Sequence, residues 1–102
     1  NSDRQIGRGS LPVLVDGLAP WCGPCKMMAP AYEAAAKALE PHIRLVKLNS
    51  DKEQAVAARL GIRGIPTMVL FHRQREIARV SGAMSTGQIV NWVREHLPAG
   101  TS

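Results

Sequence analysis

Apolar residues in this chain fall into short runs, and the spacing within the runs changes along the sequence. Residues 11–18 are apolar and rich in valine, which predicts a strand covered on both faces. Over residues 23–40 the apolar positions recur every three or four residues, as in a helix that buries one side. Pro30 lies inside this helix and is expected to kink it, and Pro41 follows its end.

The chain then returns to strand and helix patterns. Residues 43–48 form the next predicted strand, so the first strand, the helix and this strand make a unit that is normally a right-handed parallel crossover. Ser50 and Glu53 have the spacing of a capping box and predict the start of a short helix. Gly61 stands where a left-handed residue would end that helix.

The last third of the chain predicts a hairpin and a closing helix. Residues 67–72 and 76–81 are strand-like runs joined by a short polar link, which favours antiparallel pairing. Ser85 and Gln88 have capping-box spacing ahead of an apolar stripe at helical spacing. The sum of these elements predicts a small α/β domain with a mixed central sheet and helices on both faces.

The composition fits a single domain and is consistent with the predicted α/β fold. The chain has 102 residues, of which 45% are hydrophobic and 21% charged. No run approaches the roughly 18 uninterrupted apolar residues of a membrane span, so we expect no membrane partner. We expect residues 1–10, which lack the apolar core of a signal peptide, to be a flexible lead-in. The domain is expected over residues 11–97, with a tail at 98–102.

The charge invites a nucleic-acid interpretation that the distribution of the basic residues does not support. The net charge is +5, but the basic residues are scattered and only Arg73, Arg75 and Arg79 lie close together. That stretch contains none of the aromatic residues that could stack on single-stranded bases. We therefore expect no nucleic-acid partner.

The clearest chemical signal is the pair Cys22 and Cys25, at the junction of the first strand and the first helix. A structural disulfide across so short a loop would stabilise the fold by only about 2 kcal/mol. A zinc site would need two more ligands, and the three histidines lie far apart in the sequence, so we expect no metal. Redox chemistry fits best, because the N-terminus of a helix stabilises a thiolate and lowers its pKa.

The two cysteines are expected to have different roles in the reaction. Cys22, at the helix N-terminus, is the candidate nucleophile, and Cys25 is expected to be more deeply buried and to resolve the mixed disulfide. Between them, Gly23 relaxes the backbone and Pro24 fixes φ in the first helical turn. The absence of a histidine from this spacer favours a reductant over an oxidant.

Several segments together resemble the thioredoxin family. They are WCGPCKM at residues 21–27, KLN at 47–49, GIRGIPT at 61–67 and VSGA at 80–83. The resemblance covers about residues 11–97 and implies a thioredoxin fold and a cytoplasmic thiol–disulfide oxidoreductase without a bound cofactor. It implies disulfide-containing protein substrates, and a flavoprotein thioredoxin reductase that recharges the dithiol with electrons from NADPH.

The resemblance also implies a role for a buried acid. Asp16 lies six residues before Cys22 in an apolar strand, so we expect it to be buried, with a raised pKa. Lys47 on the neighbouring strand offers an ion pair with it. In thioredoxins the matching Asp and Lys lie beneath the active site, and the Asp acts as general base for the buried cysteine through water; the same role is implied for Asp16.

Substrate binding is the remaining function that the resemblance implies. Pro66 matches the family's cis-proline, and its turn would expose the backbone of Ile65 to an extended substrate segment as an added strand. The implied binding surface comprises Trp21, Gly23, Pro24, Gly64, Ile65, Pro66 and Gly82. Trp92, at helical spacing in the last helix, is expected to pack instead.

The chain departs from the family pattern at three places. Gly17 and Leu18 replace two aromatic residues, which is expected to weaken the strand and loosen the support of Cys22. Residues 73–75 replace the usual Asn-Gly hairpin turn, so a different or longer turn is expected. The family's first strand has no counterpart before residue 11, so it is expected to be missing or altered, leaving the edge at residues 43–48 open.

An open edge leads to two alternatives for the molecule, a monomer of lower stability or an edge-mediated dimer. Pro20 before Trp21 resembles a thioredoxin C-like subgroup that carries an N-terminal zinc ribbon, whose cysteines this chain lacks. Two other functions stay open beside protein-disulfide reduction. One is a non-catalytic binding module with this fold, and the other is a disulfide oxidase or isomerase.

Overall fold

Four strands and three helices are arranged in one layered domain in this computed structural model, which describes residues 11–97. The elements are β1 (Val13–Leu18), α2 (Gly23–Leu39), β2 (Arg44–Asn49), α3 (Gln54–Arg59), β3 (Thr67–His72), β4 (Arg75–Ser81) and α4 (Thr86–His96). The strand order is β2-β1-β3-β4. β1 is parallel to β2 and antiparallel to β3, and β4 is antiparallel to β3.

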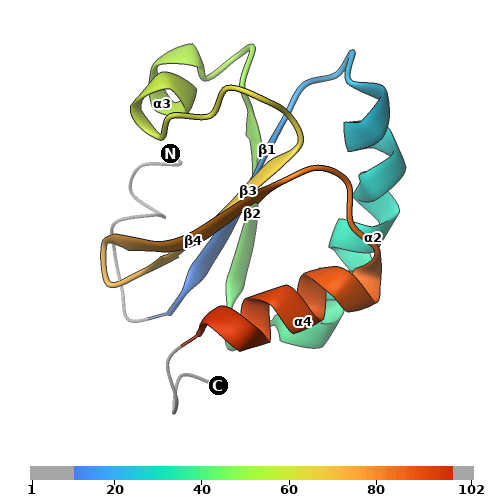
Figure 1. Cartoon of the computed structure of the whole chain (residues 1–102), viewed down its shortest axis with the longest axis vertical. Helices are drawn as coiled ribbons and strands as arrows, with labels where there is room; N and C mark the ends of the chain where they lie inside the picture. The colour runs from blue at the N-terminus through green and yellow to red at the C-terminus, as the bar shows by residue number, and fades with distance from the viewer. Residues whose placement is uncertain (1–10, 98–102) are drawn as a thin grey trace.

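Figure 1 shows α2 and α4 together on one side of the sheet and α3 on the other. A mixed sheet with helices on both faces confirms the predicted fold class. The expected lead-in, tail and altered first strand concern residues 1–10 and 98–102, which lie outside the described residues. Within residues 11–97, no helix is long and apolar enough to cross a membrane.

β1 is the central strand, and its alternating side chains build two separate cores. Leu14 packs into the core beneath α2 and α4, which includes Met28 and Ile89. Val13 and Val15 point to the opposite face and pack with residues of α3. Because β1 is covered on both faces, the apolar residues that alternate along it are all accounted for, and the predicted strand is confirmed.

Two predicted helix ends are confirmed. Gly61 follows α3 with φ +70°, a left-handed conformation that glycine adopts without a steric penalty. At the start of α4, Ser85 Oγ accepts a hydrogen bond from the backbone N of Gln88 at 3.2 Å, and the backbone N of Ser85 donates to Gln88 Oε1 at 2.9 Å. This reciprocal pair is the predicted capping box.

The capping box predicted at Ser50 and Glu53 is wrong. Ser50 Oγ donates instead to the carbonyl O of Leu18 at 2.9 Å, so the hydroxyl ties the end of β2 to the end of β1. The turn is closed by Asn49, whose Oδ1 accepts from the backbone N of Asp51 at 3.0 Å. Glu53 is itself the N-cap residue of α3 and makes no side-chain capping bond.

The expected longer or different hairpin turn is also wrong. His72 pairs directly with Arg75, so only Arg73 and Gln74 form the loop. Their φ angles are 52° and 69°. Positive φ at both central residues is the signature of the two-residue I′ turn, which Asn-Gly normally forms. The backbone of the turn is therefore retained although neither preferred residue is present.

Gly17 leaves no gap in β1. It pairs with Leu48 on one side and Thr67 on the other, so the strand is continuous across it. A Cβ placed on Gly17 would lie 3.0 Å from Cδ1 of Ile62. The side chain of Ile62 therefore occupies the space beside this glycine and takes part in the core on the α3 face.

Candidate active site

The cysteine pair lies where β1 gives way to α2. Cys22 is the N-cap residue of the helix, and Pro24 lies in its first turn, as the sequence predicts. The two sulfurs are joined in a disulfide, with the Cα atoms 5.2 Å apart. The backbone N of Cys25 donates to Cys22 Sγ at 3.2 Å. An N–H group and the helix dipole thus both point at this sulfur, which favours negative charge on it.

The prediction that Cys25 is the more deeply buried cysteine is wrong for this disulfide form. Cys22 is 4% exposed and Cys25 is 5% exposed. The two cysteines are almost equally buried because both belong to a small apolar cluster, in which Ala19 is buried and Ile65 packs from the facing loop. That loop covers Cys22 as effectively as the helix covers Cys25.

The rim of the site carries exposed apolar side chains beside this buried disulfide. Trp21 is 70% exposed, which confirms its predicted surface position. Its Nε1 donates to Oδ2 of Asp51 at 2.8 Å, and Met27 nearby in α2 is 81% exposed. Asp51 is a residue of this rim that was not predicted from the sequence. The signal was available, because β1 and β2 are parallel and the residues that follow them meet at one edge.

The loop before β3 faces the disulfide from the other side. The Ile65–Pro66 peptide bond is cis, the isomer that the family resemblance implies, and the carbonyl O of Ile65 lies 3.9 Å from Cys22 Sγ. The backbone N of Gly82 donates to the carbonyl O of Pro66 at 2.9 Å. Gly64 and Gly82 are exposed, whereas Ile65 is half-buried and Pro66 is buried.

The predicted surface residues therefore divide into two groups. Trp21, Gly23 and Pro24 are exposed on the helix side of the disulfide. The second group comes from the loop before β3 and from Gly82, which follows β4. The structure brings both groups together around Cys22, because β1 and β3 are neighbours in the sheet.

Asp16 is buried in β1, six residues before Cys22. It lies on the face of β1 that packs against α2 and is 1% exposed. Burial raises the pKa of its carboxyl from 3.8 to about 7, and the nearby charge of Lys47 lowers that pKa in part. Its Oδ1 has no hydrogen-bond partner among the described residues. The predicted burial and raised pKa are both confirmed.

The predicted ion pair between Asp16 and Lys47 is wrong. The two residues are neighbours in the parallel pairing of β1 and β2. Lys47 Nζ nevertheless lies 3.6 Å from Oε1 of Glu33 in α2, and the two side chains are 44% and 68% exposed. The ammonium group avoids the cost of burial by turning toward water and this second carboxylate.

Tyr32 is a second polar group on the α2 face, although its spacing in the sequence fits only the apolar stripe predicted over residues 23–40. Its hydroxyl lies 2.9 Å from the carbonyl O of Leu14 and 2.8 Å from that of Val46. Burial raises the pKa of Tyr32 well above its usual value, and the charge of Asp16 raises it further. The hydroxyl therefore stays protonated and links α2 to both parallel strands.

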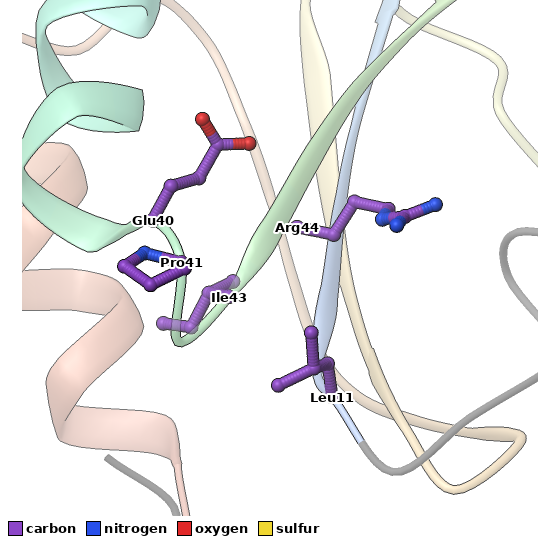
Figure 2. Close-up of a pocket in the computed structure, with 5 residues that line it drawn as sticks. All are labelled: Leu11, Glu40, Pro41, Ile43 and Arg44. Carbon is purple, nitrogen blue, oxygen red and sulfur yellow. The ribbon is translucent and has the colours of Figure 1, made fainter.

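A separate hollow lies at the other end of the sheet. Its volume is about 350 Å³, and its walls come from a residue that precedes β1, the loop between α2 and β2, and the first residue of β2 (Figure 2). The lining residues are Leu11, Glu40, Pro41, Ile43 and Arg44. Because Cys22 follows the opposite end of β1, this hollow is not part of the redox site.

Comparison with known proteins agrees with this geometry. The thioredoxin family model matches residues 1–95. Thioredoxin 1 of Synechococcus elongatus is 38% identical over 92% of this chain and 88% of its own length. Thioredoxin of Haemophilus influenzae is 39% identical over 90% and 86%. Thioredoxin C-3 of Corynebacterium nephridii is 39% identical over 95% of this chain and 66% of its own length.

Proposed function

The chain belongs to the thioredoxin family, and from this premise we propose a role for each residue of its redox site. The protein is a thiol–disulfide oxidoreductase that reduces protein disulfides through Cys22 and Cys25. The observation that carries the assignment of roles is the position of Cys22. It is the N-cap of α2 and accepts a backbone N–H bond, whereas Cys25 lies one turn inside the helix.

In the first step, Cys22 is the nucleophile. Its thiolate attacks one sulfur of the substrate disulfide, forms a mixed disulfide with it, and releases the other substrate sulfur as a thiolate. The helix N-terminus supports this role because it stabilises the thiolate before the attack.

In the second step, Cys25 resolves the mixed disulfide. Asp16 takes the proton of the Cys25 thiol through an intervening water, and the resulting thiolate attacks Cys22 Sγ. The Cys22–Cys25 disulfide forms and the second substrate sulfur leaves, so that two electrons pass from the dithiol to the substrate. The unpartnered Oδ1 of Asp16 and its pKa of about 7 support a proton acceptor here, and Lys47 adjusts that pKa.

Substrate docking uses the surface around Cys22. The backbone of Ile65, next to cis-Pro66, pairs with an extended substrate segment as an added strand. The surface is completed by Trp21, Gly23, Pro24, Gly64 and Gly82. Since the carbonyl O of Ile65 lies 3.9 Å from Cys22 Sγ, a segment paired with it would bring a substrate disulfide to the nucleophile.

After each reaction the Cys22–Cys25 disulfide has to be reduced again. A flavoprotein thioredoxin reductase returns electrons from NADPH to the disulfide, and the protein works in the cytoplasm, where thiols are kept reduced. Oxidation of NADPH by a bacterial thioredoxin reductase in the presence of this protein tests the partner. No oxidation above the rate of the reductase alone would contradict it.

The roles of the two cysteines are tested by trapping. Cys25→Ser leaves the mixed disulfide unresolved, so incubation with oxidised insulin should yield a covalent adduct at Cys22 that dithiothreitol releases. Cys22→Ser is the matched control and should yield none. An adduct with Cys22→Ser alone would reverse the two roles.

A further inference from the structure

Arg79 of β4 connects two separate parts of the fold. Its Nε and Nη2 donate to Oε2 and Oε1 of Glu76, both at 2.7 Å, in a bidentate ion pair on its own strand. The same guanidinium reaches the end of α3, where Nη2 donates to the carbonyl O of Leu60 at 2.6 Å and Nη1 to that of Gly61 at 3.1 Å. The planar guanidinium thus binds the Glu76 carboxylate and the end of α3 at the same time, with Nη2 donating to both.

The two carbonyl groups that Arg79 binds belong to the end of the helix. The backbone N of Gly61 donates to the carbonyl O of Ala58 at 3.0 Å, and that of Ile62 donates to Ala57 at 3.0 Å. This is the Schellman arrangement, in which glycine adopts a positive φ and the chain leaves the helix. Arg79 therefore supports the point where the chain changes direction.

The segment that follows Gly61, residues 62–66, contains Ile65, whose backbone is proposed to bind the substrate. Residues 62–64 have no regular secondary structure, and Arg63 and Gly64 are exposed. The segment ends in the cis Ile65–Pro66 bond beside Cys22.

The far end of this segment is also attached near β4. Thr67 Oγ1 lies 3.0 Å from Ser81 Oγ and donates to the carbonyl O of Gly64. Gly82, directly after β4, donates its backbone N–H to Pro66. The exposed segment is therefore bound at its start by Arg79 and at its end by Ser81 and Gly82.

We propose that Arg79 is a positioning residue for protein-disulfide reduction, which fixes residues 62–66 so that the Ile65 backbone is presented beside Cys22. The inference rests on the proposed docking role of Ile65. If the hydrogen bonds of Arg79 to Leu60 and Gly61 are lost, only a fraction of the molecules hold the Ile65 backbone in the position that binds substrate. The apparent affinity for a protein substrate then falls by that fraction. The reactivity of Cys22 toward a small disulfide should change little, because the backbone N–H bond and the helix N-terminus that favour its thiolate both come from α2.

Two substitutions and one matched control test the proposal. Arg79→Met removes the donated bonds and keeps an unbranched apolar stem, and Arg79→Lys keeps the charge but cannot form the bidentate pair. Arg94→Met removes the same charge from the exposed surface of α4. The KM and kcat for insulin, with dithiothreitol as reductant, are compared with the rate of reaction with 5,5′-dithiobis(2-nitrobenzoate), a disulfide without a peptide segment.

We expect Arg79→Met to raise the KM for insulin by about three- to tenfold, with kcat and the rate with the small disulfide within about twofold. Arg79→Lys should lie in between, and Arg94→Met should match the wild type. An unchanged KM for Arg79→Met would overturn the proposal. So would a parallel loss with both disulfides, which would mean that Arg79 acts on the thiol or on the whole fold.

Amide hydrogen exchange provides a readout that does not depend on activity. The amides of Gly61, Ile62 and Gly82 are hydrogen-bonded at the two ends of the segment. Their exchange should be faster in Arg79→Met, or in Arg79→Lys if the first variant is unstable, while the amides of α2 stay protected. Equal exchange at Gly61, Ile62 and Gly82 would overturn the positioning role of Arg79. Failure of the proposed docking role looks different: the wild type would then react with the small disulfide but would not catalyse insulin reduction.

Discussion

Among single residues, Asp16 most clearly links structure to a measurable property. Its folded pKa of about 7 lies above the ordinary value of 3.8, so the folded state binds the proton more tightly than the unfolded state. The stability that this proton supplies is complete below about pH 4 and is lost as the pH rises through 7. At about 1.4 kcal/mol per pKa unit, the loss across this window is about 4 kcal/mol.

Asp16→Asn should remove this dependence. The variant should be more stable than the wild type above pH 7, and the difference between the two should shrink as the pH falls toward 4. Urea denaturation at pH 4, 6 and 8 measures it. Taking the difference isolates Asp16, since every other group titrates in both proteins. A constant difference across the range would mean that the carboxyl is not raised in pKa by burial.

Tyr32 supports a second prediction at the scale of one residue. Its hydroxyl has one proton, and it lies within hydrogen-bond distance of carbonyl groups on β1 and on β2. Tyr32→Phe keeps the ring and removes this link, so we expect the free energy of unfolding to fall by about 1 kcal/mol.

The control for this prediction is Tyr32→Leu, which also removes the ring from a site where the residue is 2% exposed. We expect a further loss in urea denaturation, because part of the core is then unfilled. A Tyr32→Phe variant as stable as the wild type would show that the buried hydroxyl contributes nothing net.

Some of these properties of single residues could be predicted from the sequence. Burial of Asp16 followed from its place in an apolar run, and the surface position of Trp21 followed from its place beside Cys22. The ion pair of Lys47 did not follow, because strand neighbours share a register but the rotamer decides between Asp16 and Glu33. A competition between a buried and an exposed carboxylate depends on solvation, which spacing in the sequence does not encode.

At the scale of elements, the β3–β4 turn carries a conformational cost. Arg73 and Gln74 both have positive φ, which costs roughly 1–2 kcal/mol for a residue with a Cβ. Replacing them together by Asn and Gly should stabilise the protein by about 1–2 kcal/mol, because these residues favour the I′ turn. The shift of the midpoint in urea measures it.

The matched control for the turn keeps a Cβ at both positions. Arg73→Lys with Gln74→Ala changes the side chains but not the demand for positive φ, so it should bring no gain. An equal gain in both double variants would mean that the side chains, not the backbone, limit the stability of the turn.

Element ends show where prediction from sequence succeeds and where it fails. The capping box at Ser85 was predictable because both of its bonds lie within four residues of one another. The one at Ser50 failed because Leu18, distant in the chain, offers its carbonyl O to the same hydroxyl. Local patterns predict local bonds, and a partner from a neighbouring strand overrides them.

At the scale of the whole molecule, the position of β2 at one end of the described sheet and the net charge of the chain have opposite effects on self-association. Within residues 11–97, β2 has a strand neighbour only on its β1 side. An unpaired edge favours pairing with a second copy. The net charge of +5 opposes it, and so does Arg44, which is exposed on this strand. These charges should keep the protein largely monomeric at low salt, where repulsion is little screened.

Arg44→Thr tests this balance. It removes a charge from the edge and supplies a residue that favours strands, so sedimentation velocity at low salt should show more dimer than for the wild type. Arg94→Thr removes the same charge from α4 and should leave the distribution unchanged, because only the edge pairs with another chain. If both variants stay monomeric at the highest concentration, even when salt screens the net charge, the β2 edge is not a surface for self-association. If both dimerise alike, net charge rather than the edge controls assembly.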